Sequence, residues 1–495
     1  RYQVVVANPP YMGSGGMNPN LLEFVRRTFA NASTDLYSVF TIRNLSLVKA
    51  QGLVGMITIP NWMFLASFED FRRFLLQHVR VESLVHNGRG VWGSDFGSCS
   101  FILSNCPANN QAGSYRKLFN RQGEVQSNDE IESNFFNLEK FPLYKRVKTD
   151  FEKIPGWPLG FWLNSTEYEA FKDGVSLTEM STPVVGLQTG DNERFIRNWN
   201  EVSFRKIGFG FRTSQEALLS KAKWFPYTKG GTFRKWYGNN SFIIDWENDG
   251  YVIRNHPSSR PQNRNYYFRS GLAYTNVSSA SFAARFTDSG FIFDQKGSMF
   301  FSANNNHSVF TLGLLHTKIV TRLLTVLCPT VDFNPGSLAK IPVISFATIG
   351  HKVQSIITEL INLARIDWDN FETSWDFRKL PLLRPELKAE TLAASWQNWQ
   401  AHCDAAIRRM QELERENNRL FIVESFTPLR FPKRYMSRYG QLMEHSPFCE
   451  RDIIPPSNLE THDEEGEFLV YIKKNQMMFP TTYKYHPFGA IGWDG

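Results

Sequence analysis

The chain has 495 residues, enough for roughly two to four domains, and its 42% apolar and 21% charged residues are ordinary for a folded protein. A formal net charge of +7 favours an anionic partner, whereas five cysteines without a CxxC pair argue against a disulfide framework and a zinc site. The chain has neither an apolar run of about eighteen residues nor a signal peptide, so we expect a cytoplasmic protein with no membrane partner.

The first predicted element is a strand that ends at an unusual tetrapeptide. Residues 2–6 (YQVVV) form a β-branched run, which is typical of a buried strand in a parallel sheet. Asn8-Pro9-Pro10-Tyr11 follows, and its prolines end the strand because they cannot donate to a ladder. The chain starts at Arg1 rather than at a methionine and enters a strand at once, so we expect the natural protein to have residues upstream.

Further elements alternate between helix and strand over the first hundred residues. The spacing of apolar residues predicts helices at 21–29, 35–48 and 68–78, and strands at 52–60, 81–85 and 99–103. This alternation is typical of a doubly wound α/β sheet.

The pattern changes from about residue 105 onward. Residues 184–342 are rich in aromatic residues, Gly, Asn and Arg with short strand-like runs, which favours a separate α+β or mostly β domain. Helices are predicted at 351–364 and 387–420. The last sixty or so residues are rich in loop-forming residues, and no role is assigned to them.

The tetrapeptide has the groups needed to activate an exocyclic amine. In an open α/β sheet, ligands bind outside the carboxyl ends of the strands. There the Asn8 side-chain carbonyl and the Pro9 backbone carbonyl offer two acceptors, which the prolines hold in place. Two acceptors on the hydrogens of adenine N6 would free its lone pair for attack on a methyl group, and Tyr11 would stack on a base flipped out of its helix. The alternative is an ordinary Pro-rich turn.

A segment in the middle of the chain mixes basic and aromatic residues. Basic residues contact phosphates, while Arg, Asn and Gln read base edges, so the cluster favours DNA contact over a solvated loop with core aromatics. The Asp367, Asp369 and Asp376 carboxylates alternate with Trp and fit surface pairs and packing better than a metal site. The candidate DNA contacts in this segment are Lys229, Arg234, Lys235, Trp236, Tyr237 and Arg264.

Taken in order, these motifs resemble a known enzyme family. The tetrapeptide, then Asp35-Leu36-Tyr37, GLVGMITIP at 52–60 and FGSCSFIL at 96–103 are similar to motifs IV, V, VI and VIII of the γ-class amino methyltransferases. GLQTG at 186–190 with Arg194-Phe195, WFPYTKGGTFRKWYGN at 224–239 and residues 312–333 resemble the PglX family, the adenine-specific DNA methyltransferases of BREX phage-defence systems. The resemblance covers about residues 1–425 and extends more distantly to single-chain type II restriction–modification enzymes.

The resemblance implies S-adenosylmethionine as methyl donor and an adenine in double-stranded DNA as acceptor. It gives Asn8, Pro9, Pro10 and Tyr11 the catalytic positions, and it leaves Phe96 and Phe101 as alternative rings for the second face of the base. The cofactor would lie near Asn8, Asp35 and Leu36, and Gln188 and Arg194 join the candidate DNA contacts. Other BREX proteins and phage anti-restriction inhibitors are the implied partners, and no metal is expected.

We expect a methyltransferase domain at 1–180 that contains the C-terminal half of the doubly wound sheet. A DNA target-recognition domain at 181–345, a helical spacer at 346–425 and a segment of unknown role at 426–495 would follow. The glycine-rich donor loop of the family belongs upstream of the tetrapeptide, and Gly13-Ser14-Gly15-Gly16 does not replace it, so the chain alone should be inactive. The alternatives are a non-catalytic DNA-recognition subunit and, below it, a protein-glutamine or RNA methyltransferase.

Overall fold

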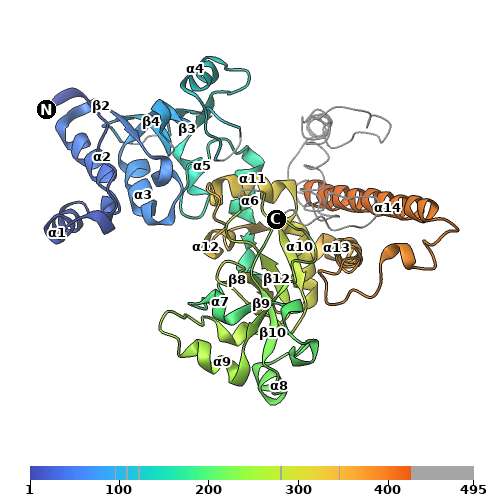
Figure 1. The fold of residues 1–495 in the computed structure, drawn as a ribbon. Coiled ribbons are helices and arrows are strands. Elements are labelled where there is room, and N and C mark those ends of the chain that lie inside the picture. The colour runs from blue at the N-terminus through green and yellow to red at the C-terminus, as the bar shows by residue number, and fades with distance from the viewer. Residues whose placement is uncertain (95, 108–109, 121–122, 279–280, 345, 425–495) are drawn as a thin grey trace. The chain divides into compact units, whose positions relative to one another are not determined.

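The computed structural model describes residues 1–424, apart from residues 95, 108–109, 121–122, 279–280 and 345. The predicted segment at 426–495 therefore lies outside the described residues. The chain divides into two compact units, each of which is described by itself (Figure 1). The first unit contains Arg1–Val175 and Arg322–Pro342, and the second contains Ser176–Thr321 and the described residues from Val343 onward.

A six-stranded mixed sheet forms the centre of the first unit. Its order is β1 (Tyr2–Ala7), β2 (Val48–Thr58), β4 (Gly97–Ser104), β3 (Arg80–Arg89), β5 (Gly113–Lys117) and β6 (Tyr144–Arg146). β1 is parallel to β2 and β3 to β5, while β4 runs antiparallel to both of its neighbours. Because β4 reverses direction between β2 and β3, those two strands and β1 have their carboxyl ends at the same edge.

One face of this sheet is packed and the other is partly open. Helices α2 (Leu36–Leu47) and α3 (Glu69–His78) share a core with Val54 and Met56 of β2 and with Phe101 and Leu103 of β4. The predicted strand at 2–6 is confirmed as β1, but its predicted burial is wrong, because Val4 is 55% and Val6 78% exposed. An apolar run predicts burial on both faces, and here β1 is an edge strand covered on one face.

The first unit contains further helices. They are α1 (Pro19–Thr28), α4 (Asn128–Phe136), α5 (Lys148–Glu152), α6 (Ser165–Asp173) and α12 (Pro335–Leu338). α11 (Lys318–Leu327) crosses from the second unit into the first, and the short strands β7 (Val175–Ser176) and β16 (Pro342–Val343) pair with each other. The helices predicted at 21–29, 35–48 and 68–78 are confirmed to within a few residues.

Two four-stranded sheets form the core of the second unit, which confirms the predicted α+β class. One has the order β14 (Ile292–Phe293), β10 (Trp224–Thr228), β11 (Phe242–Asp245) and β9 (Ile196–Asn198). The other has the order β13 (Ala284–Thr287), β12 (Gly271–Tyr274), β15 (Met299–Ser302) and β8 (Ser181–Val184). Aromatic side chains from both sheets, among them Tyr227, Phe293 and Phe301, share one core, and much of the aromatic excess is therefore structural.

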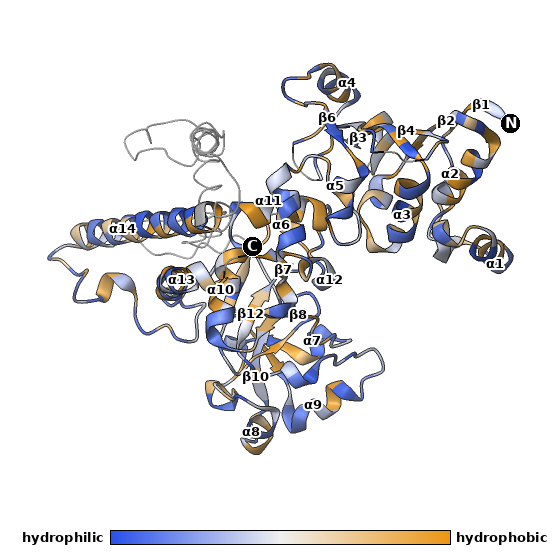
Figure 2. Cartoon of the chain, turned by 180° about the vertical axis from the view of Figure 1, so that it is seen from behind, coloured by the Kyte–Doolittle hydropathy of each residue, from blue (hydrophilic) through white to orange (hydrophobic). Residues whose placement is uncertain are grey.

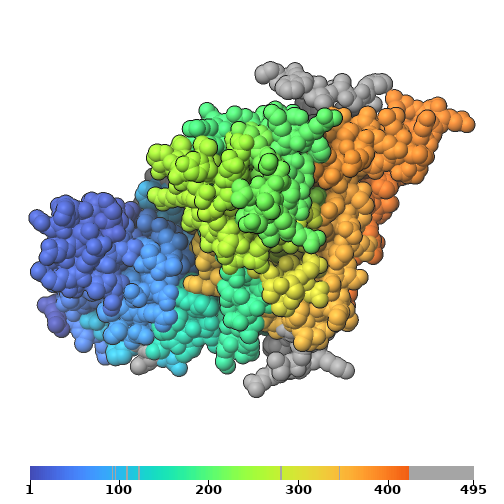
Figure 3. Space-filling view, turned by 90° about the horizontal axis from the view of Figure 1, so that it is seen from below, coloured from blue at the N-terminus to red at the C-terminus, as the bar shows by residue number. Residues whose placement is uncertain are grey.

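Helices complete the second unit. They are α7 (Asn192–Phe195), α8 (Ser214–Leu219), α9 (Glu247–Arg254), α10 (Asn305–Leu315), α13 (Phe346–Trp368) and α14 (Leu392–Arg419). α14 confirms the predicted helix at 387–420, and apolar and polar residues alternate along it (Figure 2). The Asn417 side-chain amide donates to the Gly313 carbonyl at 2.9 Å and so ties α14 to α10. Figure 3 shows the surface of this unit in green, yellow and orange.

Within the described part of the chain, no single helix has the length and apolar composition needed to cross a membrane. The bent pair α10 and α11 passes that test only when the two helices are taken together.

Candidate functional site

The tetrapeptide lies at the edge of the sheet where β1, β2 and β3 end. Asn8 follows β1 directly, Ile59 and Pro60 follow β2, and Arg89 is the last residue of β3. This is the edge at which open α/β sheets bind their ligands. The Pro9 side chain is buried while Asn8 and Tyr11 remain exposed, so the turn is anchored by one proline and presents its polar groups outward.

Tyr11 is held at this edge by its hydroxyl group and by two neighbouring rings. The hydroxyl donates to the Asn8 Oδ1 atom at 3.0 Å, and the Ile57 carbonyl lies at 3.4 Å. The Tyr11 ring meets Tyr37 and Phe96 edge to face, with centroid distances of 6.1 and 6.0 Å. Burial, and then the nearby Cys99 thiol, raise the pKa of Tyr11, so its hydroxyl remains a donor. The two predicted partners Asn8 and Tyr11 therefore lie in direct contact.

The two candidate rings for base stacking occupy different environments. Phe96 is 53% exposed and faces Tyr11, whereas Phe101 is 3% exposed and packs against Trp62 with a centroid distance of 5.0 Å. Phe101 belongs to β4, where its side chain points to the packed face of the sheet. A ring covered on its faces by the core cannot stack on a base, so the structure places Phe101 in the core and leaves Phe96 as the stacking candidate.

Asp35 and Leu36 shape the loop after the tetrapeptide. The Asp35 carboxylate caps α2 by accepting from the Tyr37 backbone N–H at 3.3 Å, and it also accepts from the Met12 N–H at 3.0 Å. The Leu36 N–H donates to the Met12 carbonyl at 3.0 Å. Burial raises the pKa of Asp35 even though these N–H groups lower it. The carboxylate thus has a structural role, and its predicted place beside a cofactor stays a prediction.

Four of the predicted DNA contacts are internal contacts of the second unit. Arg234 is 5% exposed and donates to Asp367 at 2.6 Å, and Lys235 pairs with Glu414 at 2.8 Å. Trp236 is buried and donates to the same Glu414 carboxylate at 2.9 Å. Tyr237 is also buried, beneath the Arg365 guanidinium.

The structure does not support DNA contact by Arg234, Trp236 and Tyr237, which are buried, and the contact predicted for the half-buried and paired Lys235 stays a prediction. A buried cation requires a carboxylate partner, and Asp367 of α13 and Glu414 of α14 supply them. Asp367 is itself buried, so the surface pairing predicted for it is wrong.

The other predicted DNA contacts remain reachable to different degrees. Arg194 is exposed with its guanidinium 5.0 Å from the Phe195 ring, and the half-buried Lys229 lies 5.6 Å from the Phe242 ring. Gln188 is half-buried, and its backbone exchanges hydrogen bonds with Arg260 at 3.0 and 2.8 Å. Arg264 pairs with Asp249. The Arg264 side chain is 39% exposed, so Gln188, Arg194, Lys229 and Arg264 all remain candidates for contact with DNA.

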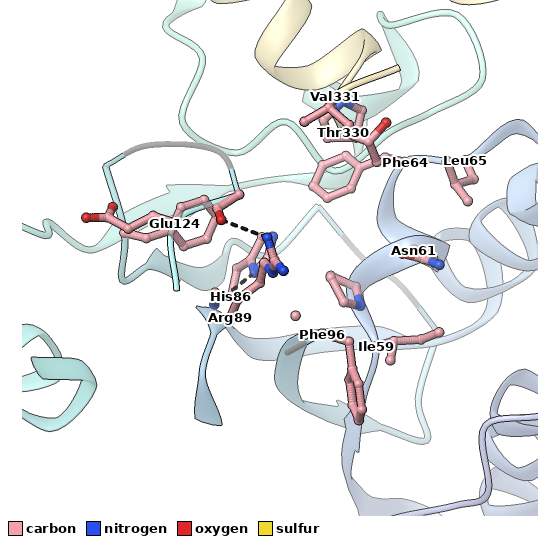
Figure 4. Close-up of a pocket in the computed structure, with 16 residues that line it drawn as sticks. Ile59, Asn61, Phe64, Leu65, His86, Arg89, Phe96, Glu124, Thr330 and Val331 are labelled. Atoms are coloured by element: carbon pink, nitrogen blue, oxygen red, sulfur yellow. Dashed lines mark hydrogen bonds between the residues drawn. The ribbon is translucent and has the colours of Figure 1, made fainter. Parts of the chain in front are cut away.

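A ring-lined pocket lies at the same edge of the sheet, and no sequence motif predicts it. It has a volume of about 300 Å³, and its aromatic walls are Phe64, His86, Phe96 and Phe119 (Figure 4). His86 lies 4.7 Å from the Phe119 ring and 6.1 Å from the Phe64 ring. Burial, and then the Lys117 charge, lower the pKa of His86 to about 3, so its ring is neutral near pH 7. The lining also includes Ile59, Pro60, Asn61, Leu65, Gly88, Arg89, Gly97, Gly123, Glu124, Pro329, Thr330 and Val331.

Known proteins resemble this chain along most of its length. Residues 1–92 match the family described as Eco57I restriction-modification methylase. The adenine-specific methyltransferase BrxX of Escherichia coli O9:H4 (strain HS) is 32% identical over 468 residues, 91% of this chain and 37% of BrxX. The adenine-specific methyltransferase PglX of Lacticaseibacillus casei (strain Zhang) is 32% identical over 437 residues, 85% of this chain and 36% of PglX. The chain is thus similar in sequence to the BrxX and PglX methyltransferases. It spans little more than a third of their length.

Solved structures are more distant than BrxX and PglX. The type IIL restriction-modification enzyme MmeI, solved in complex with DNA, is 9% identical with a TM-score of 0.47, and the match covers 89% of this chain and 56% of MmeI. A similarity of this size supports no inference about function.

Proposed function

We propose that this chain provides the acceptor-base site and the DNA-recognition region of a site-specific DNA adenine-N6 methyltransferase. The observation that carries the proposal is the Asn8–Tyr11 turn at the carboxyl end of β1, in a chain 32% identical to two adenine-specific methyltransferases. We further propose a cytoplasmic protein of a BREX phage-defence system, which is what the resemblance of its motifs to the PglX family implies. Other BREX proteins would be its partners, and phage anti-restriction proteins its inhibitors.

The turn can hold the amino group of a flipped adenine. The exposed Asn8 Oδ1 atom and the Pro9 carbonyl would accept its two hydrogens, which makes the nitrogen more tetrahedral and frees its lone pair. Tyr11 and the exposed Phe96 ring would lie against the base. No strong base is required, because the methylated ammonium is acidic and loses its proton readily. S-adenosylmethionine, when bound, would supply the methyl group.

The described residues fit only one side of the donor. Asn8 is exposed at the ligand edge and can face the methyl group, whereas the Asp35 carboxylate is buried and already accepts two backbone N–H groups. That arrangement also favours the second candidate function, in which the chain alone recognises DNA without binding the donor. Methylation by a chimera that restores the rest of the enzyme distinguishes the two, because a chain that serves only in recognition binds DNA but supports no methylation that depends on Asn8.

The proposal is tested in a chimera in which this chain replaces the matching stretch of E. coli BrxX. Cells expressing the chimera should contain N6-methyladenine at a defined DNA site, as read by sequencing of modified bases. Asn8→Ala should reduce methylation at least about 100-fold, the effect of losing one preorganised hydrogen-bonding group in a reacting site. Methylation that Asn8→Ala leaves unchanged would overturn the proposal, and so would its absence in a chimera that folds.

A further inference from the structure

The ring-lined pocket is separate from the Asn8–Tyr11 turn but adjoins it. None of the four residues of the turn lines the pocket, and Phe96 belongs to both places, with its ring against Tyr11 and along one wall of the pocket. The other walls follow β2, end β3, follow β5 and return from Pro329–Val331. Together with the Phe96 segment, five segments converge on the pocket at the ligand edge of the sheet (Figure 4). A group that leaves the turn past Phe96 therefore reaches the pocket next.

The lining suits a flat, uncharged ring. Phe64, His86, Phe96 and Phe119 supply four aromatic groups, and the imidazole is neutral. Every nucleobase has a π-face, and stacking on aromatic side chains tolerates any base sequence. Of the charged lining residues, Arg89 would stay near the sugar and phosphates, and it also donates to the Gly123 carbonyl at 2.8 Å.

The size and rigidity of the pocket also suit a single base. A volume of about 300 Å³ lies at the lower end of the range for small-molecule sites, too small for a dinucleotide. The wall at Gly88 is fixed, because this residue has φ +85° and a Cβ there would lie 2.9 Å from the Phe119 ring. Behind Phe119, the Lys117 amine lies 4.6 Å from the ring centroid and supports that wall of the pocket.

We propose that the ring-lined pocket holds a second nucleobase, the one next to the target adenine on the same DNA strand, with Phe96 between the two bases. This inference rests on the proposed function. In this arrangement two consecutive bases would leave the helix stack together, and the pocket would replace the stacking that the second base loses.

The test uses a single-stranded probe in which only one base can occupy the target site, so the position of each neighbouring base is known. The probe is the pentanucleotide TTATT, whose only adenine is the base that Asn8 should take, and calorimetry measures its affinity for the full chain. Versions with an abasic residue on the 5′ or the 3′ side of the adenine report the contribution of each neighbour. Val331→Trp adds a ring to an exposed lining position, and Phe64→Leu removes one ring but keeps the wall apolar. Leu143→Trp, at an exposed position outside the pocket, is the matched control.

We expect one abasic probe to bind the wild-type chain about 10-fold more weakly than TTATT, as for the loss of one stacked base. Both pocket variants, Val331→Trp and Phe64→Leu, should bind TTATT more weakly than wild type does. Each should bind TTATT and that abasic probe with the same affinity, while Leu143→Trp behaves as wild type. Equal affinity of all probes, or pocket variants with wild-type sensitivity, would overturn the inference and leave the proposed function standing. If TTATT binds no better than TTTTT and Asn8→Ala has no effect, the proposed function fails and the inference fails with it.

Discussion

At the scale of single residues, the Tyr11 hydroxyl is already bonded to the acceptor atom that the proposed reaction needs. Its hydroxyl donates to Asn8 Oδ1 at 3.0 Å, so an adenine amino group must displace it before it can donate to the same atom. A net hydrogen bond in a protein contributes about 1 kcal/mol. In the absence of a base, this contact gives Asn8 Oδ1 a hydrogen-bond donor. When a base binds, the contact is lost, and the binding free energy for the base is weakened by that same contribution of about 1 kcal/mol.

Tyr11→Phe should therefore tighten the binding of TTATT about 2- to 10-fold, because it keeps the ring and removes the competing donor. In an Asn8→Ala background the same substitution should change nothing, since the hydroxyl then has no bond to Asn8 to lose. Calorimetric titration of the four chains measures this coupling. Tyr144→Phe, a half-buried tyrosine of β6, is the control. Equal effects in both backgrounds would show that the hydroxyl does not compete with the base.

At the scale of elements, the ends of strands provide chemical groups and the contacts between helices and strands provide stability. β1 and β3 deliver Asn8 and His86 to one edge of the sheet. In the second unit, α13 and α14 provide the carboxylates of Asp367 and Glu414 that pair with the turn after β10. Arg234 and Lys235 of that turn thus stabilise the fold.

His86 should make the first unit sensitive to acid. The pKa of His86 is about 3 in the folded chain, compared with the ordinary value of 6.5 in the unfolded chain. Below pH 6.5, therefore, the unfolded chain binds a proton at His86 that the folded chain does not bind. The free energy of unfolding of the wild-type chain should therefore fall from pH 6.5 toward pH 3. Between pH 7 and pH 4.5, the decrease in the free energy of unfolding should be smaller in His86→Gln than in wild type, by on the order of 2–3 kcal/mol. Urea unfolding at the two pH values measures this difference. An identical loss in both proteins would contradict the prediction.

Arg234→Met should destabilise the second unit by about 3–5 kcal/mol, because it leaves the Asp367 carboxylate buried without its partner. Arg234→Met combined with Asp367→Leu should recover most of that loss, since neither charge is then buried. Urea unfolding gives both values, and a filter-binding assay checks that the double variant binds DNA as wild type does. If Arg234→Met is as stable as wild type but binds DNA more weakly, Arg234 contacts DNA and the prediction is contradicted.

At the scale of the whole molecule, a net charge of +7 suits a polyanion, but only exposed and unneutralised cations release counterions from DNA. Lys235 is 18% exposed and paired with Glu414, whereas Arg194 is exposed. The two residues therefore provide a matched pair of charge deletions.

Arg194→Ala should weaken DNA binding at low salt and make the plot of log affinity against log salt shallower by about one unit. Lys235→Ala should leave the slope unchanged, because its charge is already neutralised within the fold. Fluorescence anisotropy with a labelled duplex between 50 and 200 mM salt, on the order of the range over which phosphate contacts weaken, measures both. A shallower slope for Lys235→Ala alone would reverse the assignment.

The sequence by itself determined the local features of this protein. The β-branched run ending in Asn8-Pro9-Pro10-Tyr11 predicts a strand and a rigid turn from neighbouring residues, and the helix and strand periods predict the α/β and α+β classes. Tertiary structure alone decided which aromatic and basic side chains are accessible. Arg234 and Asp367 are 133 positions apart, and Lys235 and Glu414 are 179 apart. The choice between Phe96 and Phe101, the exposed face of β1 and the ring-lined pocket likewise depend on which distant segments cover each side chain. Burial and ion pairing are properties of such distant contacts, which local sequence patterns do not record.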